Sequence, residues 1–263
     1  MTLTKENYFT IENKFISNSR IGDFLKDKNY FYKKHVTGEI ENKKTIPMLV
    51  GSACDIWLTV GRKEFEKQYI AVSRRNLKLP PEGITELTMS QYEEIVSICE
   101  RVEQQDAYKE LADHQKQQIL TMPMDLGKFV GLAGIPDWFQ VNGSKATITD
   151  LKTAEQAKIA VKYHYHCLDY GYYRQMATYD LLIRYNYPDV KEIEHRHLVV
   201  EKDPDDVHNV YTFILDAERV EMEKEFILTD ILPAIAKETE FAPSNVKWSD
   251  SVVIGEINSG DDF

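Results

Sequence analysis

Residues 131–153 read GLAGIPDWFQVNGSKATITDLKT and contain the most informative pattern in the chain. Short runs of apolar and β-branched residues lie on both sides of Asn142-Gly143, a pair that is a strong signal for a two-residue hairpin turn. The pattern therefore predicts two antiparallel strands. Asp137 begins the first strand and Asp150 ends the second, so pairing around the turn brings their carboxylates close together.

Lys152 adds a positive charge beside these two carboxylates. Because it follows Asp150 by two residues in a strand, both side chains project from the same face. Burying two carboxylates and a lysine together is costly unless their charges are compensated. A divalent cation provides that compensation: Mg²⁺ or Mn²⁺ prefers hard carboxylate oxygens, and the ammonium can orient a water or stabilise a charged phosphorane. The simpler alternative is a surface ion pair at a strand end, which contributes little energy.

The rest of the chain predicts a sheet flanked by helices. A helical pattern precedes the hairpin, and helices and strands alternate after it. We predict helices at 19–38, 48–60, 63–69, 90–104, 107–114, 163–187 and 217–238, and strands at 69–72, 118–124, 129–134, 135–141, 145–151, 195–200 and 210–215. Ser90 and Glu93 have the spacing of a capping box at the start of the fourth helix. This order predicts an α/β fold with a central mixed sheet flanked by helices and a helical N-terminal part.

Composition indicates one globular domain. Hydrophobic residues make up 43% of the 263 residues and charged residues 29%, enough to bury a core. We expect a single domain at 1–248, with a mainly helical part at 1–115 and the candidate catalytic core at 116–240. Residues 249–263 form an acidic tail that we interpret as disordered or partner-binding. No apolar run approaches the roughly 20 residues that span a bilayer, and no signal-peptide core is present, so we expect a cytoplasmic protein without membrane contact.

The cysteines and the charge weigh against several classes of protein. Cys54, Cys99 and Cys167 show no CxxC spacing, which argues against a zinc ribbon or a disulfide framework. Three cysteines are also too few for a four-cysteine iron–sulfur cluster. The net charge is 32 − 43 = −11, which is mild evidence against contact with nucleic acid because phosphate binding needs local Lys and Arg. A basic groove can nevertheless coexist with an acidic exterior.

The helix after the second hairpin strand carries a further candidate pattern. Residues 175–179 read QMATY, which places Gln175 and Tyr179 four residues apart on one helix face. An amphipathic core helix with a half-buried tyrosine is the simpler interpretation. Arg174, next to Gln175, is a candidate phosphate contact, although a solvated helix charge explains it equally well.

In this order, Asp137, the hairpin, the DxK sequence at 150–152 and the QxxxY helix resemble the PD-(D/E)xK nucleases of the RecB-like branch. Residues 51–58, GSACDIWL, and the strand at 69–72 are similar to the GxxxH helix and following strand of RecE-type, or phage-type, exonucleases. The resemblance covers residues 17–225, and the DxK and QxxxY motifs are its most specific parts. It implies a PD-(D/E)xK, restriction-endonuclease-like core.

The resemblance also implies a role for each matching residue of the hairpin. Asp137 and Asp150 match the metal-binding carboxylates, and Lys152 matches the catalytic lysine. Leu151 would contribute its carbonyl oxygen to the metal. The implied reaction is hydrolysis of a phosphodiester by a metal-activated water, with Mg²⁺ as cofactor and Mn²⁺ as a substitute.

Two further matches and one departure complete the candidate site. Gln175 and Tyr179 match the positions that steady the active centre and contact the DNA end. Asp55 stands where the family usually has a histidine. A carboxylate can still ligate Mg²⁺, and it can raise the pKa of a neighbouring carboxyl group. We therefore weigh two interpretations, in which Asp55 is a substituted metal ligand or marks a site with weakened catalysis.

Together with the candidate site, this resemblance implies a Mg²⁺-dependent exonuclease that acts on double-stranded DNA ends in recombination or repair. The resemblance further implies a single-strand annealing protein as a partner and a homo-oligomer that threads DNA. A first alternative is a related endonuclease or a CRISPR-associated type of nuclease, whose common form has a cysteine cluster that is missing here. A second alternative is a nuclease fold that binds DNA or protein without catalysis.

Overall fold

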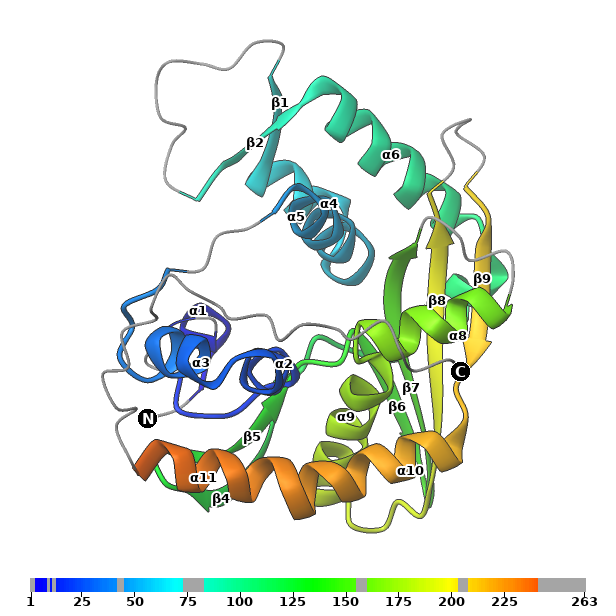
Figure 1. Cartoon of the computed structure of the whole chain (residues 1–263). Coiled ribbons are helices and arrows are strands. Elements are labelled where there is room, and N and C mark those ends of the chain that lie inside the picture. The colour runs from blue at the N-terminus through cyan, green and yellow to red at the C-terminus, as the bar shows by residue number, and fades with distance from the viewer. Residues whose placement is uncertain are drawn as a thin grey trace, which may run out of the picture.

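The computed structural model describes residues 3–8, 10, 13–41, 45–72, 83–154, 160–202 and 208–240 (Figure 1). Its α-helices are α1 (Lys5–Tyr8), α2 (Asn18–Lys26), α3 (Lys28–His35), α4 (Ile46–Asp55), α5 (Arg62–Gln68), α6 (Met89–Glu103), α7 (Asp106–Lys109), α8 (Ala160–Asp169), α9 (Tyr172–Asn186), α10 (Ala217–Phe226) and α11 (Leu232–Glu240), with π-helical turns η1 (Ile56–Val60) and η2 (Ile227–Ile231). Its strands are β1 (Tyr69–Val72), β2 (Thr85–Thr88), β3 (Gln115–Lys116), β4 (Leu120–Leu126), β5 (Phe129–Gly134), β6 (Trp138–Asn142), β7 (Lys145–Ala154), β8 (Glu192–Glu201) and β9 (Val210–Ile214). The predicted acidic tail lies outside the described residues.

The central sheet has five strands in the order β3-β6-β7-β8-β9. Strands β7 and β8 are parallel, whereas the other neighbouring pairs are antiparallel, so the sheet is mixed. Strands β1 and β2 form a small parallel sheet, and β4 and β5 form an antiparallel hairpin. The predicted α/β fold with a central mixed sheet flanked by helices is therefore confirmed.

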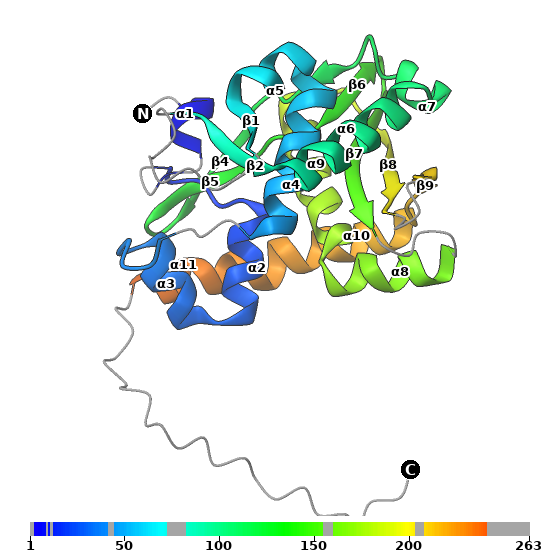
Figure 2. The ribbon, with the colours of Figure 1, turned by 90° about the horizontal axis from the view of Figure 1, so that it is seen from above.

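Alternating side chains of the central sheet pack into two hydrophobic cores. Phe139 and Ile148 pack in a core with residues from α2, α3, α9 and the C-terminal helices, whereas Trp138 and Leu151 pack with residues from α4, α5 and α6. Figure 1 shows α4, α5 and α6 together at the top, and α2, α3, α9 and the C-terminal helices in the lower part. Figure 2 gives the view from above. Asp150 lies two residues after Ile148 in β7, so its side chain projects from the same face of the sheet, toward α9.

The β6–β7 hairpin turns one residue later than predicted. Asn142 pairs with Lys145, so the two loop residues are Gly143 and Ser144 rather than Asn142 and Gly143. Gly143 has a φ of 59°, as the first loop position of a type II′ turn requires. Extending the Trp138–Thr149 pairing by one residue places Asp137 opposite Asp150.

The helix boundaries also correct several expectations. The predicted capping box at Ser90 and Glu93 is wrong, because Thr88 caps α6: its side chain accepts from the Gln91 N–H at 3.2 Å, and Gln91 Oε1 accepts from the Thr88 N–H at 2.9 Å. The predicted helix at 163–187 is two helices, separated at Gly171 with a φ of 64°. The predicted first helix likewise divides into α2 and α3 at Asp27, whose extended backbone and side chain cap α3.

Close packing ties the β4–β5 hairpin to the helix of the QxxxY motif. A Cβ atom added at Gly134 would lie 2.8 Å from Leu182 and 2.9 Å from Tyr179, distances that real Cβ contacts avoid. Gly134 therefore lets β5 approach α9 closely, just before the chain reaches Asp137.

Among the described residues, no helix combines the length and apolar character needed to cross a membrane.

Candidate active site

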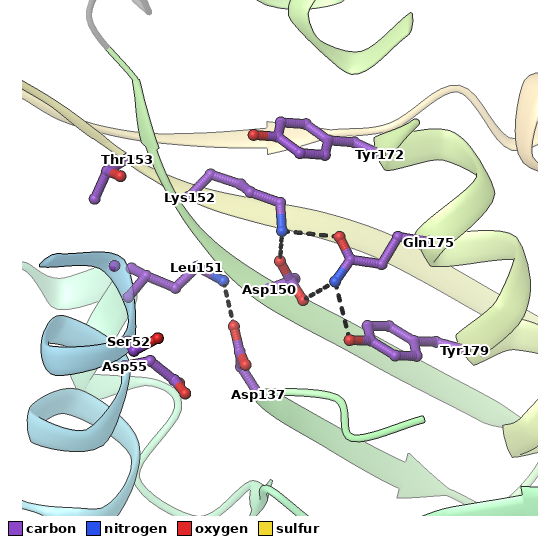
Figure 3. Close-up of a pocket in the computed structure, with 11 residues that line it drawn as sticks. Ser52, Asp55, Asp137, Asp150, Leu151, Lys152, Thr153, Tyr172, Gln175 and Tyr179 are labelled. Atoms are coloured by element: carbon purple, nitrogen blue, oxygen red, sulfur yellow. Dashed lines mark hydrogen bonds and ion pairs between the residues drawn. The ribbon is translucent and has the colours of Figure 1, made fainter. Parts of the chain in front are cut away.

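The predicted site residues gather around one cleft of about 300 Å³ (Figure 3). The cleft lies between the last turns of α4, the end of β7 and the first turns of α9. Its lining residues are Gly51, Ser52, Asp55, Asp137, Asp150, Leu151, Lys152, Thr153, Tyr172, Gln175 and Tyr179. Every residue that the sequence placed in the site lines this cleft except Arg174.

Asp150, Lys152 and Gln175 form a closed triangle of hydrogen bonds. Lys152 Nζ donates to Asp150 Oδ2 and, at 2.9 Å, to Gln175 Oε1. Gln175 Nε2 donates to Asp150 Oδ1 at 3.1 Å. The Asp150 side chain is 2% exposed and that of Lys152 12%. Burial lowers the pKa of Lys152, but the carboxylates of Asp150 and Asp137 outweigh it, and the net pKa lies above its usual range.

Gln175 also connects the triangle to Tyr179, one helical turn further along α9. Gln175 Nε2 lies 3.0 Å from Tyr179 Oη, which donates to the carbonyl oxygen of Ile135 at 3.1 Å. Because Ile135 comes two residues before Asp137, these bonds join α9 to the chain that carries the second carboxylate. Tyr179 is only 7% exposed, and its hydroxyl group links Gln175 to the Ile135 carbonyl oxygen. Its contact with DNA stays a prediction.

Asp137 enters the cleft from the residue before β6. Its Oδ2 accepts the backbone N–H of Leu151 at 2.8 Å, which fixes it at the end of β7. Burial raises the pKa of Asp137 well above its usual range, the charges of Asp150 and Asp55 raise it further, and Lys152 opposes them. The cleft therefore places three carboxyl groups beside one lysine.

Asp55 faces the same cleft from the end of α4, where the helix widens into the π-helical turn η1. Its Oδ2 accepts from Gln117 Nε2 at 2.6 Å, whereas its Oδ1 is buried and has no hydrogen-bond partner among the described residues. Burial raises the pKa of Asp55 to about 6, with the charge of Asp150 adding and the Gln117 hydrogen bond opposing. The structure thus brings Asp55 to the site; its role as a metal ligand stays a prediction.

The donor set fits a hard cation in part. Crowded carboxylates, an unpartnered Asp55 oxygen and a single ammonium give the cleft an excess of negative oxygen ligands. Within the described ranges, however, no three His, Cys, Asp or Glu side chains are already arranged to hold a metal ion together. A cation held by the present arrangement would therefore rest on at most two of the three carboxylates, with the carbonyl oxygen of Leu151 as a further candidate ligand.

Gln117 and Tyr172 also contribute to the site, although neither was among the predicted site residues. Gln117 has a φ of 48°, a strained conformation for a residue other than glycine, and it bonds Asp55 through its side chain and the Asp137 carbonyl through its N–H at 3.2 Å. The Tyr172 ring centroid lies 4.6 Å from Lys152 Nζ, a cation–π contact. Gln117 carries no sequence signal for this role.

The contacts of Gln117 lead to a testable prediction. If the cleft binds Mg²⁺ through Asp55, Gln117→Ala should weaken that binding about 10-fold, because partners that orient metal ligands have effects of that size. Gln117→Gly should weaken it equally but unfold at a higher temperature than the alanine variant, since glycine accepts the positive φ. Titration calorimetry and thermal unfolding would measure both effects. Mg²⁺ binding equal to that of the wild type in both variants would show that the Asp55 contact is dispensable.

Arg174 is not brought to the cleft. Its Nε donates to Asn18 Oδ1 at 3.0 Å, and its guanidinium packs beside Gly22 and Gly171, which ties α9 to α2. Burial lowers the pKa of Arg174, with Glu223 opposing. The predicted contact with phosphate stays a prediction, and the structure gives Arg174 a packing role.

The PD-(D/E)xK nuclease fold is defined here by three features: an Asp before one strand, the DxK sequence on the next strand, and the helix with the QxxxY motif. Residues 17–241 match the PDDEXK-like domain of unknown function (DUF3799), and the chain belongs to this family. The predicted superfamily is therefore confirmed. No curated protein sequence matches the chain significantly.

A solved structure supports the same fold. The crystal structure of a protein from Eubacterium rectale named "Putative exonuclease" aligns with a TM-score of 0.69 over 95% of this chain and 92% of that chain, at 20% identity. The crystal structure of SSO0001 aligns with a TM-score of 0.28 over 78% of this chain and 86% of that chain, at 12% identity, which is too low to bear on the fold.

Proposed function

We propose that this protein is a metal-dependent deoxyribonuclease that hydrolyses phosphodiester bonds at double-stranded DNA ends, in recombination or repair. The observation that carries the proposal is the Asp150–Lys152–Gln175 triangle, which shares one cleft with Asp137 and Asp55. A buried lysine held between a carboxylate and an amide, beside two more acids, is costly for a fold without a chemical use for it.

Asp137, Asp150 and the carbonyl of Leu151 would hold the metal in the proposed site. Mg²⁺, or Mn²⁺ in its place, supplies Lewis-acid polarisation of the phosphate when it is bound. The chain's own contribution is to orient these ligands. The Leu151 N–H fixes Asp137, and Gln175 fixes Asp150.

Lys152 would act on the phosphate as a positioned cation. Gln175 and the Tyr172 ring hold its ammonium from two sides, so its side chain points into the cleft (Figure 3). An ammonium fixed in a partly desolvated site stabilises negative charge that develops on a phosphate oxygen far better than one in water. Gln175 would keep this geometry while the substrate replaces Asp150 as a partner of Lys152.

The preference for DNA ends needs its own test, because a related endonuclease is the main alternative. Linear double-stranded DNA and the same DNA as a closed circle would be incubated with the protein and Mg²⁺. An end-dependent exonuclease degrades the linear form and leaves the circle intact. Cutting of the circle at a comparable rate would replace the exonuclease proposal by an endonuclease.

The proposed role of Asp55 makes a separate prediction. If Asp55 is a metal ligand, Asp55→Ala should raise the Mg²⁺ concentration needed for half-maximal cleavage at least about 10-fold, in keeping with the loss of one hard ligand. Asp106→Ala, a change at an exposed acid on α7, is the matched control. An unchanged metal titration for the Asp55 variant would rule out its role as a ligand.

A further inference from the structure

A short column of aromatic rings leads from the catalytic lysine to the surface. Tyr172, which lines the cleft, lies against Lys152 Nζ on the side away from Asp137 (Figure 3). Tyr170 stacks on Tyr172 with ring centroids 5.7 Å apart and an interplanar angle of 26°. The column thus starts at the proposed phosphate-binding cation and ends in Tyr170.

Gly171 makes this stack possible at the turn between α8 and α9. Its φ of 64° is a left-handed conformation that glycine adopts without strain. The reversal it introduces sets the two tyrosines that flank it on the same side of the turn, where a continuous helix would separate them by about 200° of rotation. The stacking of Tyr170 on Tyr172 is therefore a consequence of this turn.

The outer ring of the column is open to solvent. Tyr170 is 65% exposed, and its described ring contacts are the stack on Tyr172 and an edge contact with His166 at 6.0 Å. One face of the Tyr170 ring is therefore available to a flat ligand. Base–aromatic stacking of this kind tolerates any base sequence and does not depend on charge. That matters in a chain of net charge −11, which offers little general attraction to phosphates.

We propose that Tyr170 forms a stacking subsite for an unpaired nucleobase of the strand whose phosphate lies at Lys152. A nucleic acid strand alternates phosphates and bases, so a cation with a ring stack beside it matches one repeat of the strand. Paired bases are stacked within the duplex and cannot enter such a subsite, which therefore takes a base from an overhang or a frayed end. This inference rests on the proposed nuclease function and adds the substrate form that the site favours.

The test uses labelled duplexes with a three-nucleotide single-stranded overhang, with Ca²⁺ in place of Mg²⁺ to limit cleavage. Fluorescence anisotropy would give the dissociation constant of the wild type, Tyr170→Ala, Tyr170→Trp and Tyr185→Ala. Tyr185 is the matched control, because it is also an exposed tyrosine, 54% accessible, and lies near the other end of α9. Tyr170→Ala should bind about 10-fold more weakly, the size of one lost base stack, whereas Tyr170→Trp and Tyr185→Ala should bind as the wild type does.

Abasic overhangs identify the base that is bound. Removing one base at a time should weaken wild-type binding at a single position, and at that position Tyr170→Ala should cause no further loss. Equal weakening by Tyr170→Ala on intact and on every abasic overhang would overturn the subsite, as would equal affinities of Tyr170→Ala and the wild type. If the wild type cleaves linear DNA in Mg²⁺ but these results appear, only the subsite is wrong. If the wild type neither binds nor cleaves DNA, the subsite and the proposed function both fail.

Discussion

Lys152→Ala is expected to lower the rate of DNA cleavage by about 10²–10³-fold, the loss typical when one positioned charge donor to a transition state is removed. The structure predicts this because Lys152 is the ammonium that lines the cleft beside Asp137 and Asp150. Its contacts with Gln175 and Tyr172 hold the ammonium in place. Solvent that enters the cleft of the variant does not supply the same positioned charge. Initial rates on linear DNA at saturating Mg²⁺ would measure the effect.

Two controls separate this loss from misfolding. Lys116→Ala changes an exposed lysine on the edge strand β3 and should cleave DNA as the wild type does. Thermal unfolding of Lys152→Ala should still show a cooperative transition, because Asp150 keeps its hydrogen bond from Gln175 Nε2. Retention of more than about one tenth of the wild-type rate by a folded Lys152→Ala protein would remove the lysine from the proposed mechanism.

The largest effect on stability is expected from Asp180→Asn, away from the cleft. Buried Asp180 accepts from Arg184 Nε at 2.7 Å, from His195 Nε2 at 3.1 Å and from Lys224 Nζ at 3.0 Å, which joins α9, β8 and α10. Asparagine keeps the shape but leaves Arg184 and Lys224 without their shared carboxylate. The free energy of unfolding at pH 7 should fall by about 3 kcal/mol, whereas Asp189→Asn, at an exposed position, should change it by less than about 0.5 kcal/mol.

The same cluster sets a pH dependence. Burial raises the pKa of Asp180, but its hydrogen bonds with His195, Arg184 and Lys224 outweigh burial and lower the pKa from 3.8 to about 2. A depressed carboxyl pKa contributes stability that is fully present above the unfolded value and is lost as the pH falls through the folded value. The difference between the wild type and Asp180→Asn in urea unfolding should therefore be constant above about pH 5 and shrink between pH 4 and pH 2. A difference that grows on acidification would contradict this assignment.

The acidic cluster was predictable because strand geometry determines it. A strand places residues two apart on one face, so Asp150 and Lys152 had to lie together. The hairpin then brought Asp137 opposite Asp150, although the turn lies at Gly143-Ser144 rather than at the predicted Asn142-Gly143. The helical period likewise put Gln175 and Tyr179 on one face, and the structure joins them by a hydrogen bond.

The residues that the sequence did not identify depend on tertiary contacts. Gln117 meets Asp55 across 62 positions of the chain, and no local pattern marks a glutamine with a positive φ. Arg174 follows the same rule, because it is next to Gln175 in sequence but does not line the cleft. Neighbouring helix residues point about 100° apart, so Gln175 reaches the cleft while Arg174 packs against α2.

Metal-dependent cleavage of linear double-stranded DNA by the wild-type protein is the most direct test of the proposed nuclease function. The DNA would be incubated with Mg²⁺, with Mn²⁺ and with EDTA, and the release of nucleotides would be followed over time. We expect cleavage with either metal and none with EDTA. Cleavage that persists in EDTA, or a folded protein that cuts no DNA with Mg²⁺ or Mn²⁺, would contradict it.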